Sequence, residues 1–250
     1  MDILDEAERL VSAAEAQGAH LRLFGGAAVA FLVQRPLVHR HAPRDLDFVC
    51  LSSDVVTVRD VIRAAGYDED LGVARLFGTE RRRFRHDSTG LVVDLCLDQF
   101  RFARAIDLRS RLHLRSLCVP VSDLLLSKLQ PREVTTIDVI DAVNLLAAFK
   151  LAATESEDAY DAGRVASVCS RDWGLSRLVV GNLTIVERFA ADDPRCDSRR
   201  LDLLGGIAAL VQAVRLHPKT PAWHIRSAFG SRFRYWDEVS EEGYLEGTSP

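Results

Sequence analysis

Three aspartates lie in apolar, strand-like sequence. Asp45 and Asp47 stand two residues apart at the entrance of LDFVCL (46–51), so both side chains should emerge on one face of a strand. Asp94 lies in the middle of the apolar run LVVDLCLD. A buried unpaired charge is expensive, and a hard divalent cation such as Mg²⁺ relieves the repulsion between carboxylates. If the two strands are neighbours, the three acids predict a site for two metal ions, one on nucleotide phosphates and one activating an attacking oxygen.

A pair of glycines, Gly25-Gly26, precedes the first two acids at the point where a strand passes into a helix. Glycine allows a tight turn there and lets an anion approach the peptide N–H groups at the helix start. The pair could equally serve close packing of helix and sheet. The acids, too, have an alternative in a surface turn where Arg44 neutralises them. Taken together, the two features predict a triphosphate at the glycines and a bridging Mg²⁺ at the carboxylates.

The elements that must position these residues follow from hydrophobic periodicity and turn residues. In the first half we expect helices at 4–17, 27–35 and 54–65, the last capped by Ser53 and ended by Gly66, and strands at 20–24, 46–51, 81–86 and 90–98. From residue 122 onward, apolar residues recur at three- and four-residue steps and predict helices at 122–130, 137–150, 174–191 and 201–214. The predicted fold class is α+β: a mixed β-sheet flanked by helices in residues 1–118, followed by a helical domain in residues 119–250.

Composition favours a globular protein of the cytoplasm. The chain of 250 residues is 48% hydrophobic and 27% charged, enough to bury a full core. Its apolar runs fall short of a membrane span, and the acidic N-terminus is unlike a signal peptide. The five cysteines are scattered without a C-x-x-C pair, so we expect reduced, mostly packed thiols.

Charge is unevenly distributed along the chain. Residues 75–115 carry ten arginines against five acids in a protein of net charge −4. Arg81, Arg83 and Arg85 should share one strand face, where they could contact phosphates or protect an exposed edge strand. The tail 217–236 mixes basic and aromatic residues, which could stack on RNA or pack on the helical domain. His39 and His41 precede the acids in a polar loop that could touch a nucleotide or acceptor.

In order and type, these motifs resemble the nucleotidyltransferases of the DNA polymerase β type: a strand, Gly-Gly, a helix, Asp-x-Asp and a third Asp. Within that superfamily, residues 20–150 look most like AbiEii/AbiGii-type toxin nucleotidyltransferases, which add a lysine-bearing helix and then an acidic helix start. SDLLLSKLQ (122–130) supplies Lys128, and TTIDVIDAVNLL supplies Asp138, slightly favoured, or Asp141. Ala27 stands where the family usually has Ser or Thr, which leaves only backbone donors for phosphate.

The resemblance implies a nucleotidyltransferase fold, an NTP substrate and Mg²⁺ as cofactor. It assigns catalysis to Asp45, Asp47, Asp94 and Lys128, metal binding to the three aspartates, and nucleotide binding to Gly25, Gly26, Ala27 and Arg44.

The expected reaction moves an NMP unit from an NTP to an acceptor hydroxyl. The acceptor could be tRNA or another RNA, as for a toxin held by an antitoxin protein, or a small molecule of the antibiotic type. A non-catalytic nucleotide-binding member of the same fold is the alternative. A D-x-D glycosyltransferase fits poorly, because only 44 residues precede the D-x-D.

Overall fold

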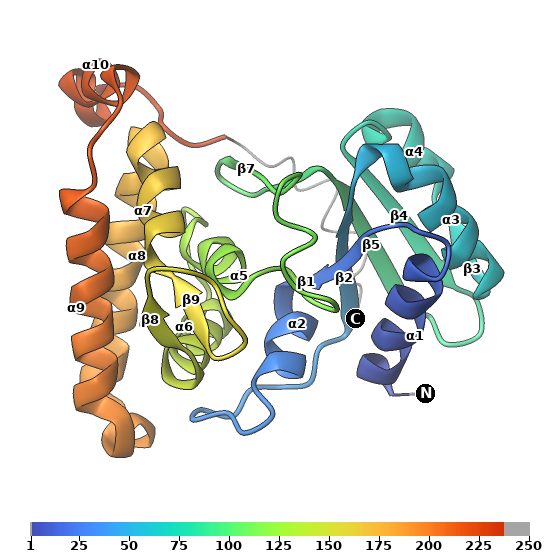
Figure 1. Ribbon diagram of the computed structural model, residues 1–250, viewed down its shortest axis with the longest axis horizontal. Coiled ribbons are helices and arrows are strands. Elements are labelled where there is room, and N and C mark those ends of the chain that lie inside the picture. Colours follow the sequence, from blue (N-terminus) through green and yellow to red (C-terminus); the bar gives the residue numbers. More distant parts are fainter. Residues whose placement is uncertain (1, 238–250) are drawn as a thin grey trace. The chain divides into compact units, whose positions relative to one another are not determined.

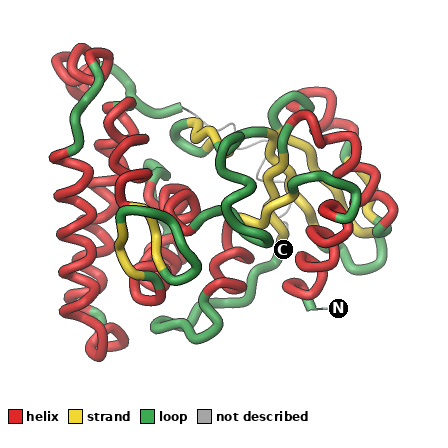
Figure 2. Tube along the Cα trace, in the orientation of Figure 1, coloured by secondary structure: helices red, strands yellow, loops and turns green. Residues whose placement is uncertain are grey.

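The computed structural model describes residues 2–237, which divide into two compact units. Within the described part, the sheet unit comprises residues 2–31 and 42–119 with Asp237, and the helical unit comprises residues 32–41 and 120–236. Figure 1 labels their elements, and Figure 2 shows helices together with most of the strands in one unit and mainly helices in the other. The predicted α+β class is confirmed.

A mixed sheet forms the centre of the sheet unit. Its five strands within the described residues run in the order β1-β2-β5-β4-β3. β2 and β5 are parallel, whereas the other neighbouring pairs are antiparallel. The strands are β1 (Leu21–Phe24), β2 (Asp45–Cys50), β3 (Tyr67–Glu69), β4 (Arg81–His86) and β5 (Val92–Leu97). A separate hairpin joins β6 (Gln99–Arg101) to β7 (Ala105–Asp107).

Side-chain alternation gives this sheet one apolar face. Leu46 and Phe48 on β2, and Val93 and Leu95 on β5, are fully buried. The helices α1 (Ile3–Glu15) and α3 (Val55–Ala64) pack against the sheet and each other. On the same face, the buried carboxylate of Glu6 accepts a 2.8 Å hydrogen bond from the Tyr67 hydroxyl, which ties α1 to β3. Because successive residues point to opposite faces, the other face carries the acids.

Two further helices belong to this part of the chain. α2 (Gly25–Leu32) follows β1 directly, and α4 (Leu71–Phe77) packs against β4. Asp2 caps α1 and Asp70 caps α4, each by accepting backbone N–H bonds at the helix start.

Two local predictions in this unit are wrong. Ser53 does not cap a helix: it lies in the 3₁₀ turn η1 (Ser52–Asp54), and α3 begins only at Val55 after Asp54. β4 is also not an edge strand, because it lies between β5 and β3. The sequence missed the edge strand β3 because three residues are too few to show a period.

The helical unit is built around α5 (Val121–Leu129), all of whose residues are buried. α6 (Thr136–Ala148), α7 (Ala162–Arg171) and α8 (Trp173–Asp192) pack against it. α9 (Arg200–Leu216) packs on α7 and α8, and α10 (Pro221–Phe229) follows. The short 3₁₀ turns η2 (Pro194–Arg199) and η3 (Gly230–Arg232) follow α8 and α10. α5, α6, α8 and α9 lie close to their predicted bounds, whereas α7 and α10 were not predicted. Residues 238–250 of the predicted helical domain lie outside the described residues.

The helical half also contains a small ribbon that periodicity did not predict. β8 (Lys150–Ala152) and β9 (Ala159–Asp161) pair in parallel around a polar loop. In the tail, the Arg226 guanidinium lies over the Trp173 ring at 4.8 Å and donates to the Phe233 carbonyl at 2.8 Å. Part of the tail is therefore used in packing.

All five cysteines are free, and four of them are buried, as expected. Among residues 2–237, no helix combines the length and the apolar character that crossing a membrane would require.

Candidate active site

The three predicted acids share one face of the sheet. β2 and β5 are neighbours, and Asp47 pairs in register with Asp94, so their side chains project to the same side. Asp45 lies two residues before Asp47 and projects with it. Neighbouring strands are about 4.8 Å apart, which brings the carboxylates of Asp47 and Asp94 to adjacent positions. This surface is called the acid face below.

Gly25 is fitted closely against Asp47. Its φ is +67°, in the left-handed region, and a Cβ added there would lie 2.1 Å from Asp47 Oδ2. A side chain at residue 25 would therefore collide with the carboxylate. The glycine leaves space for Asp47 beside the start of α2, where the helix dipole favours negative charge.

Two arginines of β4 bind the third acid. Arg83 pairs with Asp94 in register and makes a forked contact, Nε to Oδ1 at 3.0 Å and Nη2 to Oδ2 at 3.1 Å. Arg81 Nη2 lies 2.8 Å from Oδ1 of the same carboxylate. Asp94 itself is buried. Two guanidinium groups thus compensate the charge of Asp94. The sequence had not assigned a specific partner to either arginine.

Two of the three carboxylates on this face suit a hard cation. Asp45 and Asp47 offer two carboxylates on one side of β2, and Mg²⁺ is commonly held by one or two carboxylates with water and phosphate oxygens. No group of three or more His, Cys, Asp or Glu side chains within residues 2–237 is arranged to hold a metal ion. The carboxylate of Asp94 is instead paired with Arg81 and Arg83.

Cys96 shares the acid face but adds no metal ligand. It is two residues beyond Asp94 on β5. Burial, reinforced by the nearby negative charge of Asp47, raises the pKa of the Cys96 thiol to about 12. Near neutral pH it is therefore a protonated thiol rather than a thiolate.

The other residues predicted to bind nucleotide lie at the two ends of the segment 25–45. Gly26 and Ala27 are in the first turn of α2, and Ala27 is buried. Arg44 is exposed just before β2. His39 and His41 are also exposed, but they lie in the loop that belongs to the helical unit.

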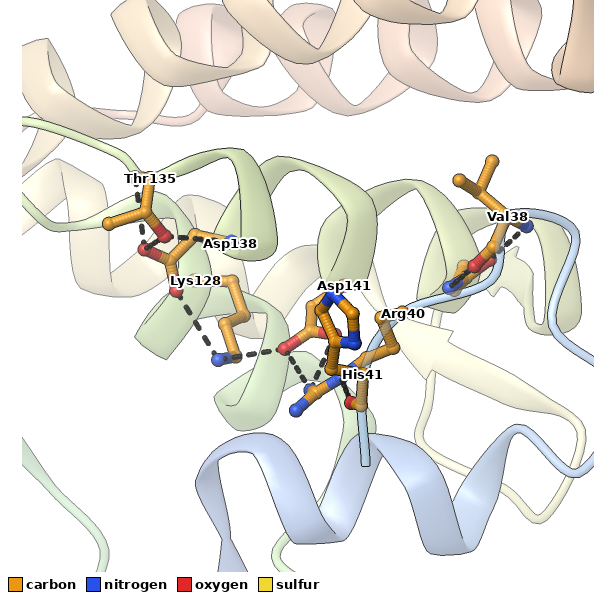
Figure 3. A network of polar contacts seen from close by, with 8 residues as sticks. Val38, Arg40, His41, Lys128, Thr135, Asp138 and Asp141 are labelled. Atoms are coloured by element: carbon orange, nitrogen blue, oxygen red, sulfur yellow. Dashed lines mark hydrogen bonds and ion pairs between the residues drawn. The ribbon is translucent and has the colours of Figure 1, made fainter. Parts of the chain in front are cut away.

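Lys128 is in the helical unit, within a buried ionic network (Figure 3). Its ammonium group lies 2.9 Å from Asp141 Oδ2 and 3.3 Å from Asp138 Oδ1. Burial acts to lower the pKa of Lys128, but Asp141 and Asp138 outweigh it and raise that pKa above its usual value. The lysine is therefore charged, and both acids suggested by the sequence contact it.

Each acid in this network has a second task. Asp138 and Thr135 form a capping box at the start of α6, with the Thr135 hydroxyl donating to Asp138 at 2.7 Å. Asp141 is fully buried and accepts from Arg40 Nη1 through both oxygens at 2.8 Å. Arg40 comes from the loop 32–41, so the network fixes this loop on α6 (Figure 3).

Asn144 is a second anchor for the same loop and was missed by sequence reasoning. Its side-chain amide accepts from the Val38 N–H at 2.9 Å and donates to the Val38 carbonyl at 2.8 Å. Asn144 is almost completely buried. A polar amide inside the apolar run AVNLLAAF was the available signal, since such a group needs a partner.

Replacing Lys128 by Met tests the energetic role of the network. We expect the free energy of unfolding in urea to fall by about 2 kcal/mol. The loss is below the range for a fully unpaired buried charge, because Asp141 keeps its contact with Arg40. Arg199→Met is the control, since both side chains of the Arg199–Asp202 pair are exposed and its loss should change stability little. A Lys128→Met protein as stable as the wild type would contradict the role assigned to the network.

No family model and no curated protein matches this chain, but solved structures do. The lincosamide antibiotic adenylyltransferase LnuA with bound lincomycin is similar at 16% identity and a TM-score of 0.42, over 56% of this chain and 94% of its own. The antibiotic-resistance factor ANT(2'')-Ia is similar at 11% identity and a TM-score of 0.38, over 75% and 93%. An antigenic nucleotidyltransferase-like protein from Paracoccidioides brasiliensis is similar at 11% identity and a TM-score of 0.37, over 88% and 94%.

Proposed function

We propose that this protein is a Mg²⁺-dependent nucleotidyltransferase, which transfers an NMP unit from an NTP to an acceptor hydroxyl and releases pyrophosphate. The observation that carries the proposal is the pairing of Asp47 with Asp94 on the acid face, beside a glycine that makes room for Asp47 at the start of α2. Carboxylates next to a helix N-terminus offer complementary partners to a metal–triphosphate: oxygens for the cation and backbone donors for the phosphates.

The roles of the acids follow from their positions. Asp45 and Asp47 would hold the metal ion of the Mg²⁺–NTP, with Gly25, Gly26, Ala27 and Arg44 at the phosphates. The bound Mg²⁺ would offset the negative charge on the phosphate oxygens. Asp94 would hold a second metal ion and accept the proton of the acceptor hydroxyl as the hydroxyl oxygen bonds to the α-phosphorus. The bond from that phosphorus to the β-phosphate oxygen breaks, and pyrophosphate leaves.

Lys128 is proposed as a catalytic residue, as the family resemblance implies. Asp138 and Asp141 hold its ammonium group in one place and keep it charged. A fixed positive charge suits the stabilisation of charge that builds up during phosphoryl transfer.

The acceptor can be an RNA, including tRNA, or a small molecule. The RNA reading agrees with the AbiEii/AbiGii-type resemblance, and an antitoxin protein would then be a partner. One observation favours the small acceptor: Arg81, Arg82, Arg83, Arg101, Arg104 and Arg109 of the basic segment 75–115 are in ion pairs with carboxylates. Such pairing leaves less positive charge for a polyanion than the sequence suggested. Incubating the protein with labelled NTPs and either RNA or aminoglycoside and lincosamide acceptors separates these readings.

NTP binding should depend on Mg²⁺. We expect calorimetry with ATP, CTP, GTP and UTP to show at least tenfold tighter binding with Mg²⁺ than with EDTA for the preferred nucleotide. Without a metal ion, Asp45 and Asp47 would repel the triphosphate. Equal affinity in both conditions for every nucleotide would rule out the metal-bridged site, and a nucleotide that binds with Mg²⁺ but is never transferred would favour a non-catalytic protein.

A further inference from the structure

The contacts of Arg81 and Arg83 bear on how a metal–triphosphate could enter the acid face. Both side chains project on the same side of the sheet as Asp94, and together they engage both of its oxygens. A carboxylate has about four lone-pair sites, and most of them are used here. A cation that approaches Asp94 is therefore repelled by two guanidinium groups already in place, and its coordination is favoured if at least one of them moves away.

Charge and exposure indicate what a displaced guanidinium group would bind. The Arg81 and Arg83 side chains are 19% and 17% exposed, against 9% for Asp94, so both arginines reach solvent more than the carboxylate does. With Asp45 and Asp47, the five side chains carry one net negative charge. An incoming Mg²⁺–triphosphate adds a cation that Asp94 can bind and anionic oxygens that the arginines can bind.

We propose that Arg81 and Arg83 are triphosphate-binding residues that exchange Asp94 for phosphate oxygens when the metal–nucleotide binds. The inference rests on the proposed function and adds two substrate-contacting residues to it. A guanidinium group suits this exchange, because its planar fork bonds carboxylates and phosphates with the same geometry. Without substrate, the same contacts compensate the charge of the buried Asp94.

The exchange predicts opposite effects of one mutation on two ligands. Arg83→Gln removes the competitor for Asp94, so Mn²⁺ alone, measured by electron paramagnetic resonance, should bind about tenfold more tightly. The same change removes a phosphate partner, so Mg²⁺–tripolyphosphate, a probe without a base, should bind about tenfold more weakly by calorimetry. Tenfold corresponds to one hydrogen bond to a charged group. Arg81→Gln should shift both affinities in the same directions.

Arg82→Gln is the matched control. Arg82 is on the same strand but pairs with Glu69 at 2.6 Å and projects to the opposite face. Neither affinity should change more than about twofold in this variant. If Arg83→Gln does not fold, Arg83→Lys keeps the charge while losing the fork, and the same two shifts are expected at a smaller size.

Two results would overturn the inference. If Mn²⁺ affinity stays unchanged or falls in the Arg83 variants while tripolyphosphate binds as in the wild type, the arginines are permanent structural partners of Asp94. If both affinities fall together, Arg83 maintains the site without exchanging partners. Failure of the proposed function looks different, because wild-type protein would then show no Mg²⁺-dependent tripolyphosphate binding.

Discussion

Asp94→Asn is expected to lower the rate of nucleotidyl transfer by about 10³-fold while Mg²⁺–NTP binding stays within about tenfold of the wild type. An acceptor hydroxyl is a poor nucleophile near neutral pH, so the loss of the group that takes its proton should act on the chemical step. Asparagine keeps the size and hydrogen bonding of the residue. Single-turnover transfer and calorimetry on the same preparation separate the two quantities.

The contacts of Asp94 give a further reason why the Asp94→Asn variant should still bind Mg²⁺–NTP. In the Asn variant, Arg81 and Arg83 lose a charged partner and are available to phosphate oxygens from the start. Asp45→Asn and Asp47→Asn should instead weaken both binding and transfer, because these acids are proposed to hold the metal ion.

Asp68→Asn is a suitable control, since Asp68 is an exposed acid on the edge strand β3. Transfer that persists in Asp94→Asn, or a variant that unfolds, would make Asp94 a structural acid of the sheet. The proposed role of the three acids would then be wrong.

The acid face illustrates what sequence patterns can predict. The strands carrying Asp47 and Asp94 were predicted within two residues at each end, because short apolar runs with β-branched and aromatic residues are typical of strands wherever they pair. The sequence did not predict that β2 and β5 are neighbours. The shared site of the three acids was predicted only on the condition that they are. Parallel pairing joins segments far apart in the chain, and no local pattern records it.

The partners of the charged residues were harder to predict than their positions. Arg81 and Arg83 were expected on one strand face, but the sequence could not distinguish phosphate contacts from an exposed edge. Their contact with Asp94 depends on the antiparallel pairing of β4 with β5, which places Arg83 opposite Asp94 and which no local pattern records. Arg40 and Asn144 act across about a hundred residues, through contacts that appear only when the loop 32–41 lies on α6.

Lys128 is a third case, in which the structure brings the lysine together with both acids that the sequence left as alternatives. The sequence offered Asp138 or Asp141 as the acid of the helix start that follows the lysine. In the structure the lysine contacts both, since they lie three residues apart and so share a face of α6. The contact with Lys128 is therefore common to both acids.

Gly25→Ala is expected to lower transfer about 100-fold and to weaken Mn²⁺ binding as well. The added Cβ would stand 2.1 Å from Asp47 Oδ2, so the carboxylate has to move. Displacing a reacting or ligating group by about 1 Å can reduce the rate by about 10². The left-handed φ of +67° adds a backbone penalty of about 1–2 kcal/mol for any residue with a Cβ. Transfer rate, Mn²⁺ affinity and the unfolding midpoint should be measured together.

Gly90→Ala separates the collision from the backbone penalty. Gly90 has a φ of +71°, close to that of Gly25, but its added Cβ would meet nothing nearer than Arg85 Nη2 at 3.8 Å. Both variants should therefore share the loss of stability from the backbone, to which the collision adds in Gly25→Ala, and only Gly25→Ala should lose Mn²⁺ affinity and transfer. If the two variants lose activity equally, the effect comes from the backbone alone. The glycine would then serve the turn between β1 and α2, and its close approach to Asp47 would have no part in binding the metal–nucleotide.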